Sequence, residues 1–307
     1  MLVSIAMATF NGEKYLSQQL DSIVKQTYKP IEVVIVDDGS NDKTIEIIQR
    51  YINNHPFISL HQNPQNLGVV ATFNKAITLC KGNFVALSDQ DDVWFDNKLE
   101  VLVNNIGDNW LIHSDAIITD QNLQTVSQSH FKFSNKPNNL EFSDYLISNN
   151  VTGCCTMLSR KLLDLAMPIP QNFYIHDHYF AIMAAFYNKI TFYAKPLLYY
   201  RQHDNSTIGA SRPDFDRLVR NCKQKAISYQ ILLDKVELRD NHELSFFQKY
   251  MQNIYQMKWI GFFNLLHLFS YKQWLKLFSA YILLSRLLGD KLSKFIFGIR
   301  YNLQRLN

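Results

Sequence analysis

Residues 84–98 read FVALSDQDDVWFDNK, an apolar run followed at once by a dense group of acidic residues. The first four residues have the pattern of a short buried strand. Four carboxylates follow within eight positions: Asp89, Asp91, Asp92 and Asp96. Carboxylates this close repel one another unless a cation, a hydrogen-bond donor or water compensates their charge. The stretch therefore indicates a strand that ends at a cation-binding site.

The spacing of these carboxylates excludes a calcium-binding EF-hand loop. With Asp89 at position 1 of such a loop, position 6 requires glycine and holds Trp94. An Asp-x-Asp pair after a buried strand instead suits Mg²⁺ or Mn²⁺, which bind one or two carboxylates together with the phosphates of a substrate. A cation held in this way neutralises a diphosphate leaving group. The Asp-x-Asp pattern alone occurs often by chance. Its position directly after a buried strand makes it a more specific indication of a metal site.

Apolar runs and helical periodicity alternate through the first hundred residues. Strands are predicted at residues 3–8, 31–36, 58–61 and 84–87, and helices at residues 15–26, 43–51 and 69–80. Such alternation is typical of βαβ units whose sheet is covered by helices on both faces. Ligands of these sheets bind beyond the carboxyl ends of the strands. We expect an α/β fold with a cleft at that edge and a flexible loop, residues 130–144, over it.

Two further strand ends carry polar residues. The first strand runs into TFNG at residues 9–12, and the second runs into DDGS at residues 37–40. Asp38 suits an acceptor for the imide N–H of a nucleobase, and Ser40 and Asp42 suit capping of the next helix. Turn and capping roles for both aspartates of the DDGS motif are the alternative. Together with the acidic stretch, three strand ends are expected to converge on one cleft.

A strand that ends in paired aspartates also suits a phosphoacceptor receiver domain or a phosphatase. In those proteins one carboxylate is the nucleophile, with a lysine and a hydroxyl on later strand ends. The later strands of this sequence offer further carboxylates instead. A receiver would be labelled by a small phosphodonor and would not bind UDP or dTDP.

Charge is distributed unevenly along the 307 residues. Residues 211–307 hold 16 basic against 7 acidic side chains, whereas residues 1–210 hold 15 against 20. Residues 245–307 combine nine basic side chains and one acidic one with many large apolar groups. Their longest uncharged run, residues 259–271, is shorter than the ~20 residues of a bilayer span. This composition is typical of helices that lie on an anionic membrane surface, and a lid or an oligomer interface is the alternative.

The cysteines and the N-terminal residues indicate in which cellular compartment the protein is expected. Cys154 and Cys155 are adjacent, which disfavours a disulfide between them, and the four cysteines have no metal-ligand spacing. No basic segment precedes the first apolar run, so we expect no signal peptide. The predicted location is the cytoplasm, peripherally on the cytoplasmic face of the inner membrane.

Two long stretches resemble the N-terminal half of family 2 glycosyltransferases, which have the GT-A fold and use nucleotide-diphospho-sugars. They are residues 3–44, VSIAMATFNGEKYLSQQLDSIVKQTYKPIEVVIVDDGSNDKT, and residues 63–94, NPQNLGVVATFNKAITLCKGNFVALSDQDDVW. The later motifs YIHDHYFAIMAAF and PLLYYRQHDNSTIGA resemble a bacterial rhamnosyltransferase-like subgroup. The resemblance covers about residues 2–210, and several motifs in the expected order make it specific.

The resemblance implies a nucleotide site built from the first two strand ends and the following loop. Thr9, Phe10 and Asp38 would surround the base. Asn66 and Gly68 would shape the loop near the ribose and phosphates.

The acidic stretch would receive distinct roles from the same resemblance. Asp91 would be the direct metal ligand, and Asp89 would lie nearer the ribose. Asp92 and Trp94 would face the sugar and acceptor side, and Asn74 would contribute to the nucleotide site from the helix at residues 69–80. Asp96 is expected to cap the helix that begins near residue 97.

The later motifs would supply the base and a second metal ligand. Asp177 would be the general base that deprotonates the acceptor hydroxyl. His176 stands where many relatives have Glu, and His178 is expected either to tune Asp177 or to cap its helix. His203 fits a late metal or diphosphate ligand, and Arg201 either contacts phosphate or supports its loop.

The sequence thus predicts a metal-dependent, inverting glycosyltransferase with a GT-A catalytic domain at residues 1–212 and a helical, basic-amphipathic region at residues 213–307. The donor would be dTDP-rhamnose, UDP-hexose or a UDP-N-acetylhexosamine, the cofactor Mn²⁺ or Mg²⁺, and the acceptor a bacterial surface glycan or lipid-linked glycan. We expect no nucleic-acid partner. A catalytically inactive nucleotide-sugar-binding or scaffold protein of the same fold is the alternative.

Overall fold

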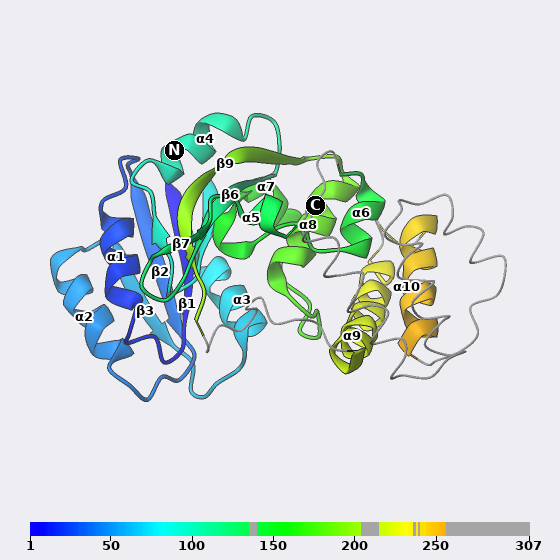
Figure 1. The fold of residues 1–307 in the computed structure, drawn as a ribbon, viewed down its shortest axis with the longest axis horizontal. Helices are drawn as coiled ribbons and strands as arrows, with labels where there is room; N and C mark the ends of the chain where they lie inside the picture. The colour runs from blue at the N-terminus through cyan, green and yellow to red at the C-terminus, as the bar shows by residue number, and fades with distance from the viewer. Residues whose placement is uncertain (135–139, 204–214, 236–237, 239, 256–307) are drawn as a thin grey trace. The chain divides into compact units, whose positions relative to one another are not determined.

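The computed structural model describes residues 1–134, 140–203, 215–235, 238 and 240–255. Contacts along the chain divide it into two compact units, Met1–Ser211 and Arg212–Asn307. The first unit holds the sheet, and the second holds helices (Figure 1).

The described strands form one mixed sheet. They are β1 Val3–Thr9, β2 Ile31–Asp37, β3 Ile58–Gln62, β4 Phe84–Ser88, β5 Val93–Trp94, β6 Leu111–Thr119, β7 Thr125–Ser127, β8 Thr156–Ser159 and β9 Ile190–Arg201. Their order is β3-β2-β1-β4-β8-β6-β9-β5, with β7 paired to β6. The first four strands are parallel, β8 runs antiparallel to both of its neighbours, and β9 runs parallel to β6. The parallel half therefore brings the carboxyl ends of β1, β2 and β4 to one edge.

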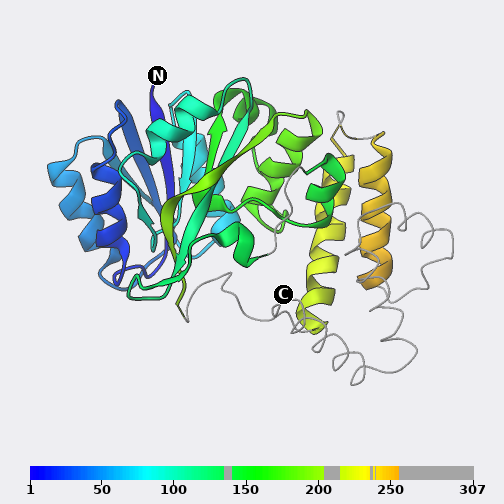
Figure 2. The same ribbon diagram turned by 45° about the horizontal axis from the view of Figure 1, so that its top comes forward.

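Helices cover both faces of the sheet. The helices of the first unit are α1 Leu16–Val24, α2 Thr44–Asn54, α3 Val69–Leu79, α4 Lys98–Asn105, α5 His130–Phe133, α6 Phe142–Ile147, α7 Arg160–Ala166 and α8 His176–Phe186. The chain moves from β1 to β3 in one direction and then back to β4, so right-handed crossovers place α1 and α2 on one face and α3 on the other. The packing of α1 on α2 and of α3 on α8 agrees with this arrangement (Figures 1 and 2).

The core explains why the N-terminal half folds in this way. The strands β1, β2 and β4 are almost continuously buried, as expected for strands covered on both faces. Their side chains form one cluster with the inner faces of α1 and α2, which includes Leu16, Leu20, Ile23, Ile47 and Ile48. All seven strands and helices predicted within residues 3–87 are confirmed, with ends that differ by a few residues.

The segment that we expected to be a flexible loop, residues 130–144, contains helical turns. Phe131 in α5 is buried, and its ring stacks on Phe192 with 3.9 Å between ring centroids. Ser129 caps α5 by accepting a hydrogen bond from the Lys132 backbone N–H. This part of the expectation was wrong because one aromatic side chain anchors the segment; residues 135–139 lie outside the described residues.

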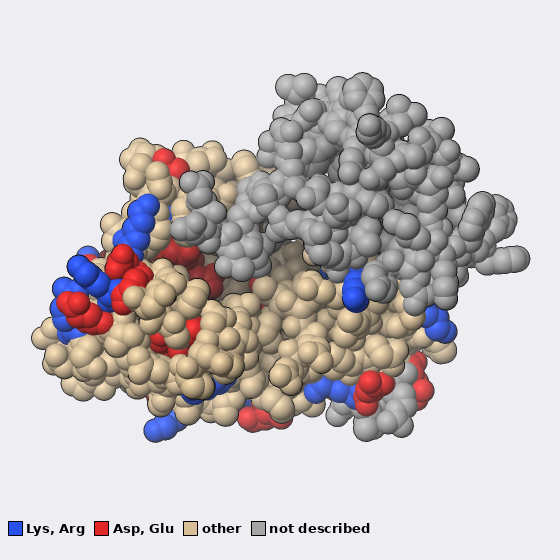
Figure 3. Space-filling model, turned by 90° about the horizontal axis from the view of Figure 1, so that it is seen from below, with Lys and Arg blue, Asp and Glu red and all other residues tan. Residues whose placement is uncertain are grey.

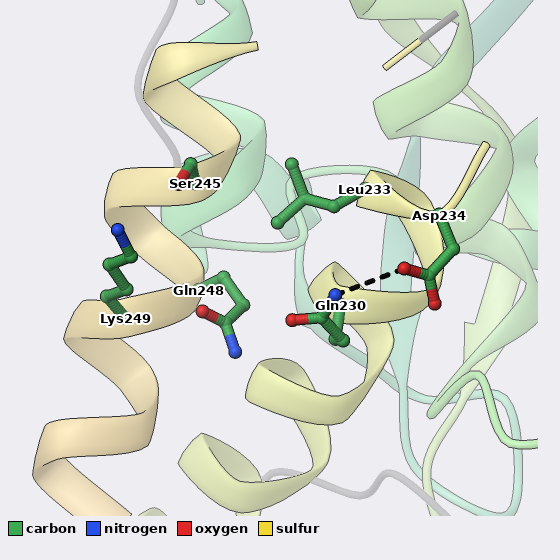
Figure 4. Close-up of a pocket in the computed structure, with 6 residues that line it drawn as sticks. All are labelled: Gln230, Leu233, Asp234, Ser245, Gln248 and Lys249. Carbon is green, nitrogen blue, oxygen red and sulfur yellow. Dashed lines mark hydrogen bonds between the residues drawn. The ribbon is translucent and has the colours of Figure 1, made fainter. Parts of the chain in front are cut away.

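The second unit contains α9 Phe215–Leu233 and α10 His242–Tyr255, which lie side by side in both ribbon views (Figures 1 and 2). The expected helical pattern therefore holds as far as Tyr255, and residues 256–307 lie outside the described residues. A polar groove between the two helices is lined by Gln230, Leu233, Asp234, Ser245, Gln248 and Lys249 (Figure 4). Within the described part of the chain, the helices are too short or too polar to span a membrane.

Candidate active site

Three loops meet at the edge where the parallel strands end. In the register of the sheet, Thr9 pairs with Asp37, and Met7 pairs with Ser88. The three strand ends therefore lie side by side, as the sequence predicted. Figure 3 looks onto the face toward which β1 runs in Figure 1, and acidic side chains gather there in and beside a recess.

The first aspartate of the DDGS motif holds its own turn together. Asp37 is buried and accepts hydrogen bonds from the Thr9 hydroxyl and from the backbone N–H groups of Gly39 and Ser40. The Ser40 hydroxyl also donates to it, so Ser40 does not cap α2 as we expected. Asp42 instead accepts from the Thr44 backbone N–H at the start of that helix. The turn is built from side chains that bond to backbone, which fixes the end of β2 beside the end of β1.

The second aspartate holds the loop that follows β3. Asp38 is 4% exposed and accepts from the Asn63 side chain and from the backbone N–H groups of Leu67 and Gly68. Burial alone would raise the pKa of Asp38, but the hydrogen bonds together lower it below its usual value. These donors hold Asp38 in its charged form and tie it to the loop that follows β3. Contact with a nucleobase remains a prediction for this residue.

Gly68 and Asn66 shape the end of the loop between β3 and α3. Gly68 precedes α3 with φ +88° and ψ 161°, a conformation that side chains rarely adopt. The Asn66 side-chain oxygen accepts from the Gly68 N–H. Asn74 lies further along α3, where its side-chain oxygen accepts from the backbone N–H of Ile169. The structure thus gives Asn74 a bond to the segment between α7 and α8.

The two predicted metal ligands come together although 112 residues separate them. Nε2 of His203, just beyond β9, lies 2.9 Å from Oδ2 of Asp91. Two ligand atoms on one octahedral ion at about 2.1 Å from the metal stand about 3 Å apart. The pair therefore fits the ligand spacing of a bound divalent ion, and both side chains keep some exposure for a substrate phosphate.

Arg201 fastens the turn after β4, residues 89–92, which is the predicted metal-binding turn. Its guanidinium donates to the backbone oxygens of Asp91 and Gln121 and to the Gln18 side chain, and it lies over the Tyr15 ring at 4.5 Å. Arg201 is 3% exposed, so its hydrogen-bonding groups face protein. The structure therefore supports the second of our two expectations for Arg201, in which it supports its loop, and not the contact with phosphate.

Asp92 and Trp94 correct two further assignments. Asp92 is fully buried, and its Oδ1 accepts from the Arg201 backbone N–H. Trp94 belongs to the hydrophobic core at 2% exposure, under the Lys98 ammonium at 3.5 Å. Neither side chain is accessible to a sugar or an acceptor. Both were misassigned because the chain turns inward directly after Asp91 and pairs β5 with β9.

A largely buried polar cluster joins the same turn to Cys154. Ligand atoms of Asp89, Asp92 and Cys154 lie within 4.8 Å of one another. Burial, together with the charges of Asp91 and Asp177, raises the pKa of Asp89 to about 7; burial also raises that of Asp92. A buried thiol is a poor ligand for Mg²⁺ or Mn²⁺, which prefer oxygen. Asp92 and Cys154 are also buried, whereas Asp91 and His203 are both partly exposed, so the Asp91 and His203 pair is more accessible to a cation and a substrate phosphate.

Lys98 supplies a positive charge to this cluster. Its ammonium is fully buried, donates to the Cys154 backbone oxygen at 2.5 Å and is attracted by Asp92 and Asp89. Burial lowers the pKa of Lys98 to about 8. Lys98 is also the first residue of α4. We expected Asp96 to cap this helix, but the capping position is Asn97, whose side chain makes no capping bond.

The predicted general base is held rigidly at the start of α8. Asp177 is 6% exposed; its Oδ1 accepts from the Asn149 side chain and the His178 backbone N–H, and its Oδ2 accepts from the Gly153 N–H. One lone-pair position on Oδ2 stays available for a proton. The charge of Asp177 also contributes to the raised pKa of Asp89.

The two histidines beside Asp177 differ in their surroundings. The His178 ring contacts the Tyr174 hydroxyl and the Tyr145 backbone oxygen within the core, so it does not cap α8; the capping position is Ile175. The His176 ring stacks on Phe73 with 4.0 Å between centroids, and burial lowers its pKa. Among the described residues, neither His176 ring nitrogen has a hydrogen-bond partner.

Three residues that the sequence left unassigned contribute to the site: Gln90, Lys98 and Asn149. Gln90 stands inside the Asp-x-Asp pair and bonds to the backbone of Phe10, which is 43% exposed. The position of Gln90 between Asp89 and Asp91 is a sequence signal from which its contribution could have been predicted. Asn149 carries no local pattern, because its partner lies 28 residues away.

Solved structures share this architecture. The chain resembles S. aureus TarS in complex with UDP-GlcNAc, with a TM-score of 0.61 at 22% identity over 84% of this chain and 73% of that one. It also resembles the mannosyltransferase PcManGT from Pyrobaculum calidifontis in complex with GDP-Man and Mn²⁺, with a TM-score of 0.59 at 16% identity over 98% and 79%. The fold is therefore a GT-A-like mixed α/β fold, as expected.

Sequence comparison gives the family. The model of glycosyl transferase family 2 matches residues 4–165, and the chain belongs to that family. An uncharacterised glycosyltransferase of Haemophilus influenzae is 37% identical over 111 residues, which are 36% of this chain and 44% of that protein. The chain spans about half the length of the curated relatives it matches.

Proposed function

We propose that the chain is a metal-dependent, inverting glycosyltransferase that moves a sugar from a nucleotide-diphospho-sugar to a hydroxyl group of a bacterial surface glycan or lipid-linked glycan. The observation that carries the proposal is the 2.9 Å approach of His203 to Asp91 at the edge where three loops converge. Two such ligands, both partly exposed, suit a diphosphate bridged by a divalent ion. The shared fold and family support the same reaction class.

Asp91 and His203 would hold Mn²⁺ or Mg²⁺, which supplies charge stabilisation to the departing diphosphate when bound. Arg201 keeps the Asp91 backbone in place, so the ligand pair is preorganised before the donor arrives. The exposed Phe10 ring and the Asp38 carboxylate would bind the base, and the loop at Gly68 would lie near the ribose and phosphates.

Asp177 would accept the proton of the attacking hydroxyl on Oδ2. The three donors described above fix the direction of the carboxylate, so the acceptor oxygen meets a base whose position does not change. Attack opposite the diphosphate inverts the anomeric centre. Holding the two reactants in line supplies much of the acceleration, and proton transfer supplies a smaller share.

Replacing Asp177 with Asn tests the base directly. Transfer should fall by about 10²- to 10⁴-fold, because an amide cannot take the proton, while nucleotide-sugar binding should be nearly unchanged. Release of nucleoside diphosphate with bacterial lipid extract as acceptor measures transfer, and calorimetry measures binding. The matched control is Asp108→Asn, an exposed loop position. Wild-type turnover in Asp177→Asn would refute the assignment.

The donor needs a separate experiment. The subgroup resemblance favours dTDP-rhamnose, whereas the relatives of known structure bind UDP-GlcNAc and GDP-Man. A thermal-shift panel of dTDP-, UDP- and GDP-sugars with and without Mn²⁺ identifies the donor through the largest metal-dependent rise in melting temperature. Binding of a donor without transfer to any extracted acceptor would favour the inactive, nucleotide-sugar-binding alternative.

We further propose that the basic C-terminal region places the enzyme on the cytoplasmic face of the inner membrane. Nine basic side chains against one acidic side chain within residues 245–307 support this proposal. The full chain should sediment with vesicles that contain phosphatidylglycerol and be released by about 0.5 M salt, which screens charge. It should not sediment with phosphatidylcholine alone. Failure to bind the anionic vesicles would count against the proposal.

A further inference from the structure

The side chain of Gln90 forms a two-bond clasp with the loop that follows β1. The Phe10 backbone N–H donates to Gln90 Oε1 at 2.9 Å, and Gln90 Nε2 donates to the Phe10 backbone oxygen at 3.0 Å. The two residues are 80 positions apart. One planar amide therefore satisfies both backbone groups of a single residue, in the way that a neighbouring strand would.

The neighbouring glycine leaves room for this clasp. A Cβ atom at Gly12 would lie 2.3 Å from Gln90 Oε1, far inside contact distance. The conflicting atom is the end of a flexible side chain, so an alanine at this position would displace the Gln90 amide rather than the backbone. The Gly12 backbone itself is held by other bonds, with its N–H donating to Thr44.

The residue that Gln90 holds is exposed and aromatic. Phe10 has 43% of its surface exposed, although it directly follows the buried strand β1. An aromatic side chain fixed through its backbone at the mouth of a ligand site provides a rigid stacking surface for a base, with little entropy lost on binding. Gln90 also stands between Asp89 and Asp91, so the clasp joins the metal-binding turn to this surface.

We propose that Gln90 is a positioning residue that, from its place between Asp89 and Asp91, fixes Phe10 as the stacking surface for the nucleobase. The proposal rests on the proposed nucleotide-sugar site. In this assignment Gln90 would touch neither the base nor the metal, because both ends of its amide bond to the Phe10 backbone. Its removal should therefore weaken nucleotide binding through Phe10, raising the KM for the donor while kcat stays within about twofold.

Three variants test the clasp by calorimetry with UDP, dTDP and GDP in the presence of Mn²⁺. Gln90→Ala should lower the affinity for the nucleotide that the wild type binds best by about tenfold, as expected for two lost hydrogen bonds. Gly12→Ala should cause a loss of similar size, because it displaces the same amide. Phe10→Ala should lower the affinity by at least as much.

Double variants separate positioning from a general effect on the fold. Gln90→Ala combined with Phe10→Ala, or with Gly12→Ala, should bind no more weakly than the weaker single variant, because both changes remove one coupled feature. Gln49→Ala, an exposed position on α2, is the matched control and should leave affinity unchanged. The Mn²⁺ concentration for half-maximal activity should change by less than about twofold in Gln90→Ala.

The outcomes distinguish this inference from the proposed function. If the wild type binds none of the three nucleotides, both fall together. If Phe10→Ala weakens binding and Gln90→Ala does not, the clasp is overturned and the nucleotide site stands. Additive losses in the Phe10 and Gln90 double variant, or a large shift in the Mn²⁺ requirement, would also overturn the clasp, since Gln90 would then act on the metal-binding turn.

Discussion

At the residue scale, the most unusual side chain is a lysine inside the core. The Lys98 ammonium lies over the Trp94 ring at 3.5 Å and is attracted by the buried Asp92 carboxylate and the partly exposed Asp89 carboxylate. A buried ammonium is costly unless negative charge and hydrogen bonds compensate it. Here the carboxyl groups and the Cys154 backbone oxygen do so, and Lys98 in turn makes a dense acidic turn tolerable.

Lys98→Met tests this balance through its dependence on pH. The pKa of Lys98 is about 8 in the folded chain and 10.5 in the unfolded one, so the unfolded chain binds more protons between these values. The stability of the wild type relative to Lys98→Met should therefore rise by about 1 to 3 kcal/mol from pH 8 to pH 10. Urea unfolding with EDTA measures the difference.

Removing Lys98 also raises the cost of ionising Asp89 and Asp92, which changes the stability difference in the same direction. Lys25→Met, at an exposed position, is the control and should show no such slope. A difference between wild type and Lys98→Met that stays constant with pH would contradict the buried charge.

At the scale of elements, loops tie the strand ends together by bonds from side chain to backbone. Asp38 at the end of β2 holds the loop that leads into α3, and Arg201 at the end of β9 holds the turn after β4. Each loop is thus fixed by an element remote in sequence. The local conformation of Gly68 is the point where such a loop demands a particular residue.

Gly68→Ala should destabilise the fold and weaken nucleotide binding together. No atom lies within 4 Å of the added Cβ, so the cost comes from the backbone conformation, at about 1 to 3 kcal/mol. Gly107→Ala is the control, since it also has positive φ and open space but lies in the turn after α4. Urea unfolding and UDP titration compare the two variants. Unchanged nucleotide affinity in Gly68→Ala would show that the loop makes no contact with the ligand.

At the scale of the whole first unit, the two halves of the sheet meet at the proposed metal site. Asp91 follows β4, the last strand of the parallel half. His203 follows β9, which lies between β6 and β5 at the other side of the sheet. The bond from Arg201 to the Asp91 backbone fastens the same junction. Metal binding should therefore depend on both halves of the sheet.

His203→Ala should raise the Mn²⁺ concentration for half-maximal activity by at least about tenfold, because one of two protein ligands is lost. Activity titrated with Mn²⁺ after treatment with EDTA measures the change. His242→Ala, exposed on α10, should behave as the wild type. An unchanged Mn²⁺ requirement in His203→Ala would remove this residue from the metal site.

Local patterns in the sequence were sufficient for the N-terminal half of the fold. Hydrophobic periodicity located the elements up to β4, since strand and helix burial repeat within a few residues. The ligand contacts that the family resemblance implied for Asp92 and Trp94 were wrong, and Arg201 supports its loop. The burial of these residues follows from the pairing of β5 with β9, about a hundred residues apart.

The chemistry of the Asp-x-Asp turn and the alternation of strands and helices are written in short stretches of the chain, because each depends on neighbours that are covalently close. Three features depend on the folded sheet instead: the approach of His203 to Asp91, the clasp of Gln90 on Phe10, and the attraction of the buried Lys98 to Asp89 and Asp92. Their partners are distant in sequence, and the free energy of each contact exists only after the strands have paired and excluded water.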